Sequence, residues 1–144
     1  YEGGDIAGVW VSNRLSYTCA FTNRRSSLQC PNKTIHIHKS STCTTNNIVY
    51  AIICLSCNKI YIGETSRRLG DRFVEHRRDI LNNRSNSPVA QHFNSVGHSL
   101  HDASVLVLRQ CYSDAQRKRT EMRLIFELGT RDPLGLNVDF SFNV

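Results

Sequence analysis

The chain has 144 residues, 40% of them hydrophobic, which suits one compact domain with a modest core. Its formal net charge of +6 favours a polyanionic partner, with nucleic acid the leading candidate. The sequence contains neither an apolar run of roughly 20 residues nor an opening signal peptide, so we expect no membrane segment and a reducing compartment. In such a compartment, the six cysteines favour metal ligation over disulfides.

Residues 1–46 are rich in Gly, Ser, Thr and Asn, and we expect an irregular connector or N-terminal arm with hints of strands only at 6–11 and 35–38. The chain opens at Tyr1 rather than at methionine, so we expect it to be part of a longer protein. This arm holds several cysteines and histidines whose spacing matches no zinc motif. They are either ordinary residues or a second zinc site: Cys19, Cys30, His36, His38 and Cys43.

Residues 48–63 predict a β-hairpin. Residues 48–54 are apolar and β-branched, 55–58 form the turn, and 59–63 form a short second strand. Strand parity places Tyr50 and Tyr61 on one face, and Gly63 permits a close approach there. One tyrosine in an apolar strand indicates core packing, whereas two on one face favour a site.

A helix follows, with apolar residues at helical spacing from Leu69 to Ile80 and with Thr65 or Ser66 as candidate N-caps. Arg72 and His76 are four residues apart and therefore share a face of this helix.

The second half of the chain predicts a short helix, a strand and a longer helix. Ser87 caps the short helix before Pro88, and Gly97 closes it. Residues 104–109 have strand composition. Asp114 can cap a helix that runs to residue 128, with Gly129 at its C-terminal end, and on this helix the Glu121 carboxylate lies in line with core residues.

Cys54-x-x-Cys57 has the spacing of a zinc knuckle, in which two thiolates on a tight turn hold one ion. His92 and His98 would complete four ligands, and His101 is the alternative to His98. Such a zinc would be structural, because four protein ligands leave no position for substrate. The other interpretation is a buried strand cysteine with surface histidines.

Five elements resemble the GIY-YIG endonuclease family and occur in that family's order. They are Ile48-Val49-Tyr50, Tyr61-Ile62-Gly63, the helix with Arg72 and His76, Glu121, and Asn137. Ile48 stands where the family usually has glycine. The cysteine pair between the two tyrosine motifs resembles more narrowly the endonuclease domain of Penelope-like retroelements.

This resemblance covers about residues 43–137. It implies an α+β fold, a small three-stranded antiparallel β-sheet flanked by helices, in a domain over residues 47–144 with an inserted zinc knuckle. It also implies a metal-dependent DNA endonuclease that hydrolyses phosphodiester bonds.

The resemblance also implies roles for individual residues. Glu121 would hold one Mg²⁺ or Mn²⁺, and Arg72 would contact the scissile phosphate. Tyr50 would be the general base or orient the water, with assistance from Tyr61, and Asn137 would close the site. The role of His76 is left open: it is an alternative base, a phosphate contact or a partly buried polar side chain.

Basic residues around two helices form the expected DNA-binding surface. Around the first helix these are Arg67, Arg68, Arg77, Arg78 and Arg84, and around the last they are Arg109, Arg117, Lys118 and Arg119. Such clusters make salt-dependent phosphate contacts that carry little sequence information.

By resemblance, the nick would prime reverse transcription by an upstream reverse transcriptase domain of the same polypeptide, and a DNA substrate would place the protein in the nucleus. Two alternatives stay open. One is a repair or recombination nuclease of the same fold, and the other is an inactive, zinc-stabilised nucleic-acid-binding module.

Overall fold

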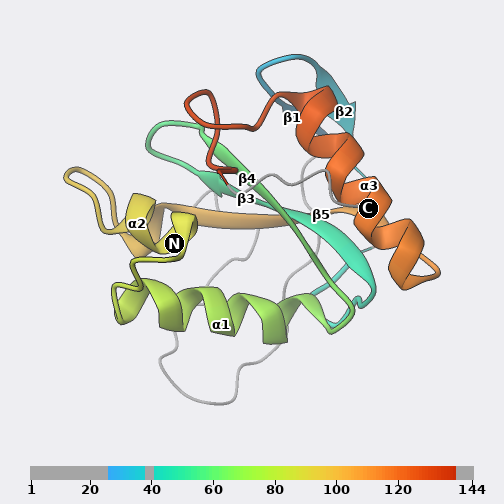
Figure 1. Ribbon diagram of the computed structural model, residues 1–144, viewed down its shortest axis with the longest axis horizontal. Helices are drawn as coiled ribbons and strands as arrows, with labels where there is room; N and C mark the ends of the chain where they lie inside the picture. The colour runs from blue at the N-terminus through green and yellow to red at the C-terminus, as the bar shows by residue number, and fades with distance from the viewer. Residues whose placement is uncertain (1–25, 38–40, 139–144) are drawn as a thin grey trace.

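The computed structural model describes residues 26–37 and 41–138 (Figure 1). Its elements in chain order are β1 (Ser27–Gln29), β2 (Thr34–His36), β3 (Ile48–Cys54), β4 (Ile60–Thr65), α1 (Leu69–Leu81), α2 (Pro88–Phe93), the 3₁₀ turn Leu100–Asp102, β5 (Ala103–Gln110) and α3 (Asp114–Leu128). Among these residues, no helix is both long enough and apolar enough to cross a bilayer.

The main sheet has three antiparallel strands in the order β4-β3-β5. All seven residues of β3 are buried, which explains why its sequence is almost continuously apolar: neighbouring strands cover both of its edges and helices cover both of its faces. The predicted fold class, α+β with a three-stranded antiparallel sheet flanked by helices, is confirmed. β4 begins and ends slightly later than the sequence predicted.

The two faces of the sheet carry separate cores. Tyr50 and Ile52 of β3 pack with α1 and α2 through Phe73 and Phe93. The alternate residues of β3, such as Ala51, pack with α3 and with the β1–β2 hairpin. Figure 1 shows the strands passing between α1 and α3. Because β4 is an edge strand, groups from α1 and α3 can meet around it.

Residues 26–37, which we expected to be irregular, form the β1–β2 hairpin. The hairpin has its own buried side chains, including Leu28 and Ile35, and they belong to the same core as α3. A domain boundary at residue 46 stays a prediction, but this part of the arm shares the core of the domain. The rest of the predicted arm, with Cys19 and His38, lies outside the described residues.

The second zinc site predicted in the arm gains no support from the described residues. Cys30 is a free thiol buried in the core below α3, whereas Cys43 is buried in the core below α1, so the sheet separates them. Cys43 is disulfide-bonded, which corrects the expectation of metal ligation for this cysteine. Where the chain is described, the one group of three or more candidate metal ligands lies elsewhere.

Helix ends agree in part with the sequence. Ser87 caps α2 by accepting from the Ala90 N–H, and Gly129 ends α3 with φ 75°, both as predicted. The N-cap of α1 is Arg68, without a side-chain bond, so the prediction of Thr65 or Ser66 was wrong. Three smaller differences complete the comparison: Ser113 rather than Asp114 caps α3, α2 ends before Asn94, and Gly97 follows in a turn.

Candidate active site

The strand register brings the two tyrosines together as the sequence predicted. Tyr50 pairs with Gly63 and Ile52 pairs with Tyr61, so both phenols lie on the α1 face of the sheet. A Cβ on Gly63 would lie 2.5 Å from the Tyr50 hydroxyl and 3.0 Å from the Tyr61 ring. Glycine is therefore required for the tyrosines to lie this close to the strand.

His76 lies between the two tyrosines. Its Nε2 is 2.6 Å from the Tyr50 hydroxyl, and its ring contacts both phenol rings edge-on at 5.7 Å. Burial, with a smaller contribution from the Arg72 charge, lowers the pKa of His76 to about 3, so the imidazole is neutral. Its Nδ1 is buried without a hydrogen-bond partner among the described residues.

A cavity of about 370 Å³ opens between β4, α1, α2 and α3. It is lined by five of the six residues predicted to carry the chemistry: Tyr61, Arg72, His76, Glu121 and Asn137. The sixth, Tyr50, is 1% exposed and lies beneath His76 instead of in the cavity wall. Burial strongly raises the pKa of Tyr50, although the Arg72 charge acts in the opposite direction, so the phenol is protonated at neutral pH.

Arg72 is held by an acid on its own helix. Its guanidinium donates to Glu75 at 2.8 Å, and Arg67 binds the same carboxylate at 2.6 Å. The hydrogen bond from Arg67 is the main cause that lowers the pKa of Glu75 to about 2. Glu75 therefore fixes the position of the Arg72 guanidinium, and Arg72 still lines the cavity.

Glu121 lies on α3 and faces the same cavity from the opposite side. Its side chain makes no hydrogen bond or ion pair with the described residues, and it is half-buried. Burial, followed by the negative charge of Glu64, raises the pKa of Glu121 to about 7. A half-buried carboxylate without a partner is a suitable ligand for a hard divalent cation that keeps most of its waters.

Asn137 acts on the backbone of β4. Its Oδ1 accepts from the Ile62 N–H at 3.0 Å and from the Thr130 hydroxyl at 2.7 Å, and its Nδ2 donates to the Ile62 carbonyl at 2.9 Å. These bonds use the polar edge of the side chain to hold Ile62, the neighbour of Tyr61. The structure therefore indicates a positioning role at the closed end of the cavity.

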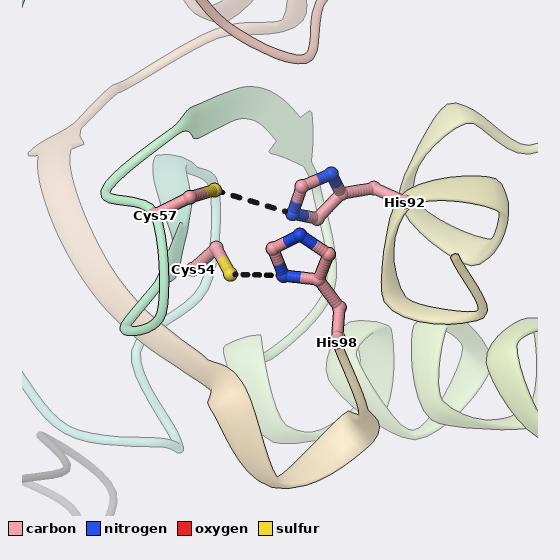
Figure 2. A group of neighbouring side chains, drawn as sticks. All are labelled: Cys54, Cys57, His92 and His98. Atoms are coloured by element: carbon pink, nitrogen blue, oxygen red, sulfur yellow. Dashed lines mark hydrogen bonds between the residues drawn. The ribbon is translucent and has the colours of Figure 1, made fainter. Parts of the chain in front are cut away.

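A second group of side chains lies at the turn between β3 and β4 (Figure 2). Cys54, Cys57, His92 and His98 place one ligand atom each within 4.8 Å of all the others. The Cys54 Sγ lies 3.4 Å from His98 Nδ1, and the Cys57 Sγ lies 3.5 Å from His92 Nε2. This group could hold one metal ion. It contains His98 and leaves out His101, as the sequence favoured.

Comparison with solved structures bears on the fold. The chain is similar to the catalytic domain of homing endonuclease I-TevI, with a TM-score of 0.54 and 22% identity over 62% of this chain and 95% of that chain. This likeness shows the fold. No protein-family model matches the sequence, and no curated protein is significantly similar to it.

The basic residues expected to bind DNA differ in exposure and in whether an acidic residue already pairs with them. Arg67 and Arg68 are exposed but paired with Glu75 and Asp71. The Arg77 Nε is buried and has no hydrogen-bond partner in the part of the chain that the structure describes. Arg78 and Lys118 are exposed. For these five, DNA contact stays a prediction.

Arg117 is a correction to the expected basic surface. It is 5% exposed and donates to Glu64 at 2.5 Å and to Asp114 and Asn47 at 2.7 and 2.6 Å. Arg117 is therefore a buried link between α3 and β4, because its Nε and Nη1 donors are already used within the domain.

The sequence analysis missed three residues around the cavity. Glu75 was not among the expected site residues, although an acid three residues after Arg72 was the available signal. Glu64 was also not among them, although its charge acts on Glu121. Asp79 lines the cavity from α1, one turn beyond His76, and no pattern in the sequence separated it from a solvent-facing acid.

Proposed function

We propose that this chain is a metal-dependent DNA endonuclease of the GIY-YIG type that hydrolyses phosphodiester bonds. One observation carries the proposal: a phenol, a guanidinium and an unpartnered carboxylate line a single cavity, although they come from β4, α1 and α3. These are the Tyr61, Arg72 and Glu121 side chains. The likeness of fold to the catalytic domain of a homing endonuclease adds support.

Arg72 would bind the scissile phosphate. A guanidinium presents paired donors to the phosphoryl oxygens, and that interaction strengthens as charge develops in the transition state. Glu121 would hold one Mg²⁺ or Mn²⁺, which its carboxylate fits because it makes no hydrogen bond or ion pair with the described residues. When bound, such an ion supplies charge at the phosphoryl and leaving oxygens.

The tyrosines and His76 would organise the attacking water. Tyr61 reaches the cavity and can hydrogen-bond that water directly, whereas Tyr50 is covered by His76. As the residues stand here, Tyr50 orients the imidazole. A general-base role for Tyr50 requires that bound substrate and cation lower its pKa, which burial raises.

Nicking of a supercoiled plasmid tests this function. The parent protein should nick with Mg²⁺ or Mn²⁺ and not without a divalent cation, and Glu121→Gln should lower the rate by roughly 10²-fold or more. Glu127→Gln is the matched control, because it removes an exposed carboxylate one and a half turns further along α3, outside the cavity.

The result depends on folded protein, so circular dichroism and zinc content accompany each assay. Equal activity of Glu121→Gln and the parent would remove Glu121 from the site. A folded, metal-loaded parent that binds DNA and never nicks would instead favour an inactive nucleic-acid-binding module.

We further propose that the Cys54, Cys57, His92 and His98 group binds structural Zn²⁺. Zinc–sulfur and zinc–nitrogen bonds of about 2.3 and 2.0–2.1 Å place tetrahedral ligand atoms about 3.3–3.8 Å apart. The two measured contacts, 3.4 and 3.5 Å, fall in that range. Two thiols and two imidazoles also form a common structural zinc set.

The biological setting we propose is a Penelope-like retroelement in the nucleus, in which the nick primes reverse transcription by an upstream reverse transcriptase domain. The zinc-knuckle spacing between the tyrosine motifs supports this assignment over a repair or recombination nuclease. The test uses the full-length protein with nicked plasmid, RNA template and labelled nucleotides. Extension of the nicked strand would support the proposal, and a full-length chain without polymerase activity would contradict it.

A further inference from the structure

A second cavity lies on another side of α3. It measures about 700 Å³ and lies between α3 and the end of β5. Three arginines line it, namely Arg109, Arg119 and Arg123, and among the described residues neither an aspartate nor a glutamate does. The cavity is therefore cationic.

The three guanidiniums remain largely available. Arg119 is exposed and makes no ion pair with the described residues. Arg123 has one long contact to Glu127, at 3.7 Å between two exposed side chains, which is a weak pair. Arg109 donates from Nη1 to the neighbouring Leu108 carbonyl and keeps its other donors.

The rest of the lining includes apolar side chains: Cys111, Met122 and Phe126. A double helix turns its phosphates outward and keeps its bases stacked, so it offers no base face to contact the apolar side chains of the cavity. A single strand presents both phosphates and bare base faces, and proteins bind such strands with basic grooves that contain aromatic residues. The volume is in the range of cavities that accept small organic groups.

From these observations we infer that the cavity binds a single-stranded segment of nucleic acid, with its phosphates on the arginines and a base among the apolar side chains of the lining. Phe126 is one of these side chains, and its ring already carries the Arg131 guanidinium at 5.3 Å from the ring centroid. The inference rests on the proposed nuclease function, since it adds a second strand-binding site to the same domain. Helical periodicity gives the relation between the sites. At about 100° per residue, Glu121 and Arg123 lie on different sides of α3, and Met122, which lies between them, lines both cavities.

Binding measured by fluorescence anisotropy tests the inference without requiring cleavage. All proteins carry Glu121→Gln, so substrates stay intact. The probes are labelled oligodeoxythymidylate, oligouridylate and a blunt DNA hairpin. Arg119→Gln/Arg123→Gln should weaken single-strand binding about tenfold, and the slope of log affinity against log salt should fall in magnitude by about 1.4, for two lost phosphate contacts.

A matched double variant controls for general charge. Lys33→Gln/Lys59→Gln removes two positive charges that line neither cavity and lie outside the expected DNA-binding surface, and should change single-strand affinity about twofold or less. Phe126→Leu should weaken binding of the single strands severalfold and leave hairpin binding unchanged, because only a bare base can stack. If the cavity variants bind both single strands more weakly, the cavity recognises the phosphates and bases that DNA and RNA share. If only one of the two probes binds more weakly, the cavity prefers that nucleic acid.

Three results would overturn the inference: equal weakening by both double variants, unchanged single-strand binding in the cavity variant, or weakening confined to the hairpin. The last would identify duplex backbone as the occupant. Plasmid nicking by the parent is scored separately. A parent that never nicks while the cavity still binds single strands would remove the nuclease proposal and leave this site in place.

Discussion

At the scale of single residues, the cavity holds its key acid in an unusual state. A solvent-exposed glutamate is ionised at neutral pH, but burial and the nearby Glu64 charge raise the pKa of Glu121 to about 7. The proton and a divalent cation therefore compete for the same oxygens. Arg72 shows the opposite arrangement, because the ionised Glu75, which Arg67 also binds, keeps it charged and directed.

This competition predicts a pH-dependent metal requirement. Below about pH 7 Glu121 is mostly protonated, so the Mg²⁺ concentration for half-maximal nicking should rise roughly tenfold for each unit of falling pH. Above that pH the carboxylate is already ionised and the requirement should level off. Titrations of Mg²⁺ in the plasmid assay from pH 5.5 to 8.5 measure the effect.

A Mg²⁺ requirement that stays constant between pH 5.5 and 7 would show that Glu121 ionises at its ordinary pKa or does not bind the ion. Glu64→Gln provides a second readout. It removes the charge that raises the pKa of Glu121, so the point at which the requirement levels off should move to lower pH.

At the scale of elements, β4 carries the candidate site and is an edge strand of the sheet. Contacts from outside the sheet hold it. Asn137 binds both backbone groups of Ile62, and the buried Arg117 binds Glu64 near the other end. Tyr61 lies between α1 and these anchors, so its place in the cavity depends on both.

Asn137→Ala should destabilise the domain by about 2–4 kcal/mol, because the Ile62 N–H and carbonyl and the Thr130 hydroxyl lose their buried partner. Nicking should also fall, since Tyr61 is adjacent to Ile62. Urea unfolding gives the free energy. Asn32→Ala, which removes one long bond from an exposed side chain, is the control and should change stability by less than about 1 kcal/mol. A loss below 1 kcal/mol for Asn137→Ala would contradict the anchoring role.

At the scale of the whole molecule, the metal-ligand group joins parts that the sheet does not connect. Cys54 is the last residue of β3 and Cys57 lies in the β3–β4 turn, whereas His92 belongs to α2 and His98 to the loop before β5 (Figure 2). An ion bound there would link α2 to the sheet, on the same side as α1. In a domain of this size, the free energy of binding such an ion contributes directly to the stability of the fold.

Removal of zinc should therefore loosen the domain. We expect one zinc per chain, and a chelator or Cys57→Ser should lower the melting temperature by roughly 10 °C or more, which corresponds to a loss of about 3 kcal/mol. Atomic emission and thermal melting measure the two quantities. His101→Ala is the control and should keep both zinc and stability, because His101 is exposed and outside the group.

Zinc lost from His101→Ala and retained by His98→Ala would reverse this ligand assignment. Zinc-free protein that melts at the same temperature as the parent would show that the group is not a structural metal site.

Several features follow from local patterns in the sequence. Strand alternation predicted that Tyr50 and Tyr61 share a face, and the apolar, β-branched run at 48–54 predicted the strand that the structure shows as β3. Helical spacing placed Arg72 and His76 together. Ser87 and Gly129 were recognised as helix ends because their conformations are set by neighbouring residues.

Other features depend on contacts between residues distant in the sequence, and local pattern cannot supply them. Composition suggested an irregular arm that includes residues 26–37, yet the hairpin forms because the core below α3 buries Leu28 and Ile35. Arg117 lies in a basic stretch of the sequence and was therefore expected on the surface. Glu64 and Asn47, more than fifty residues away in the chain, instead bind its guanidinium inside the domain. The sequence alone determined which chemical groups this protein has and in what order; tertiary packing decided which of them are exposed, charged and adjacent, because burial and ionisation depend on neighbours that only the folded chain brings together.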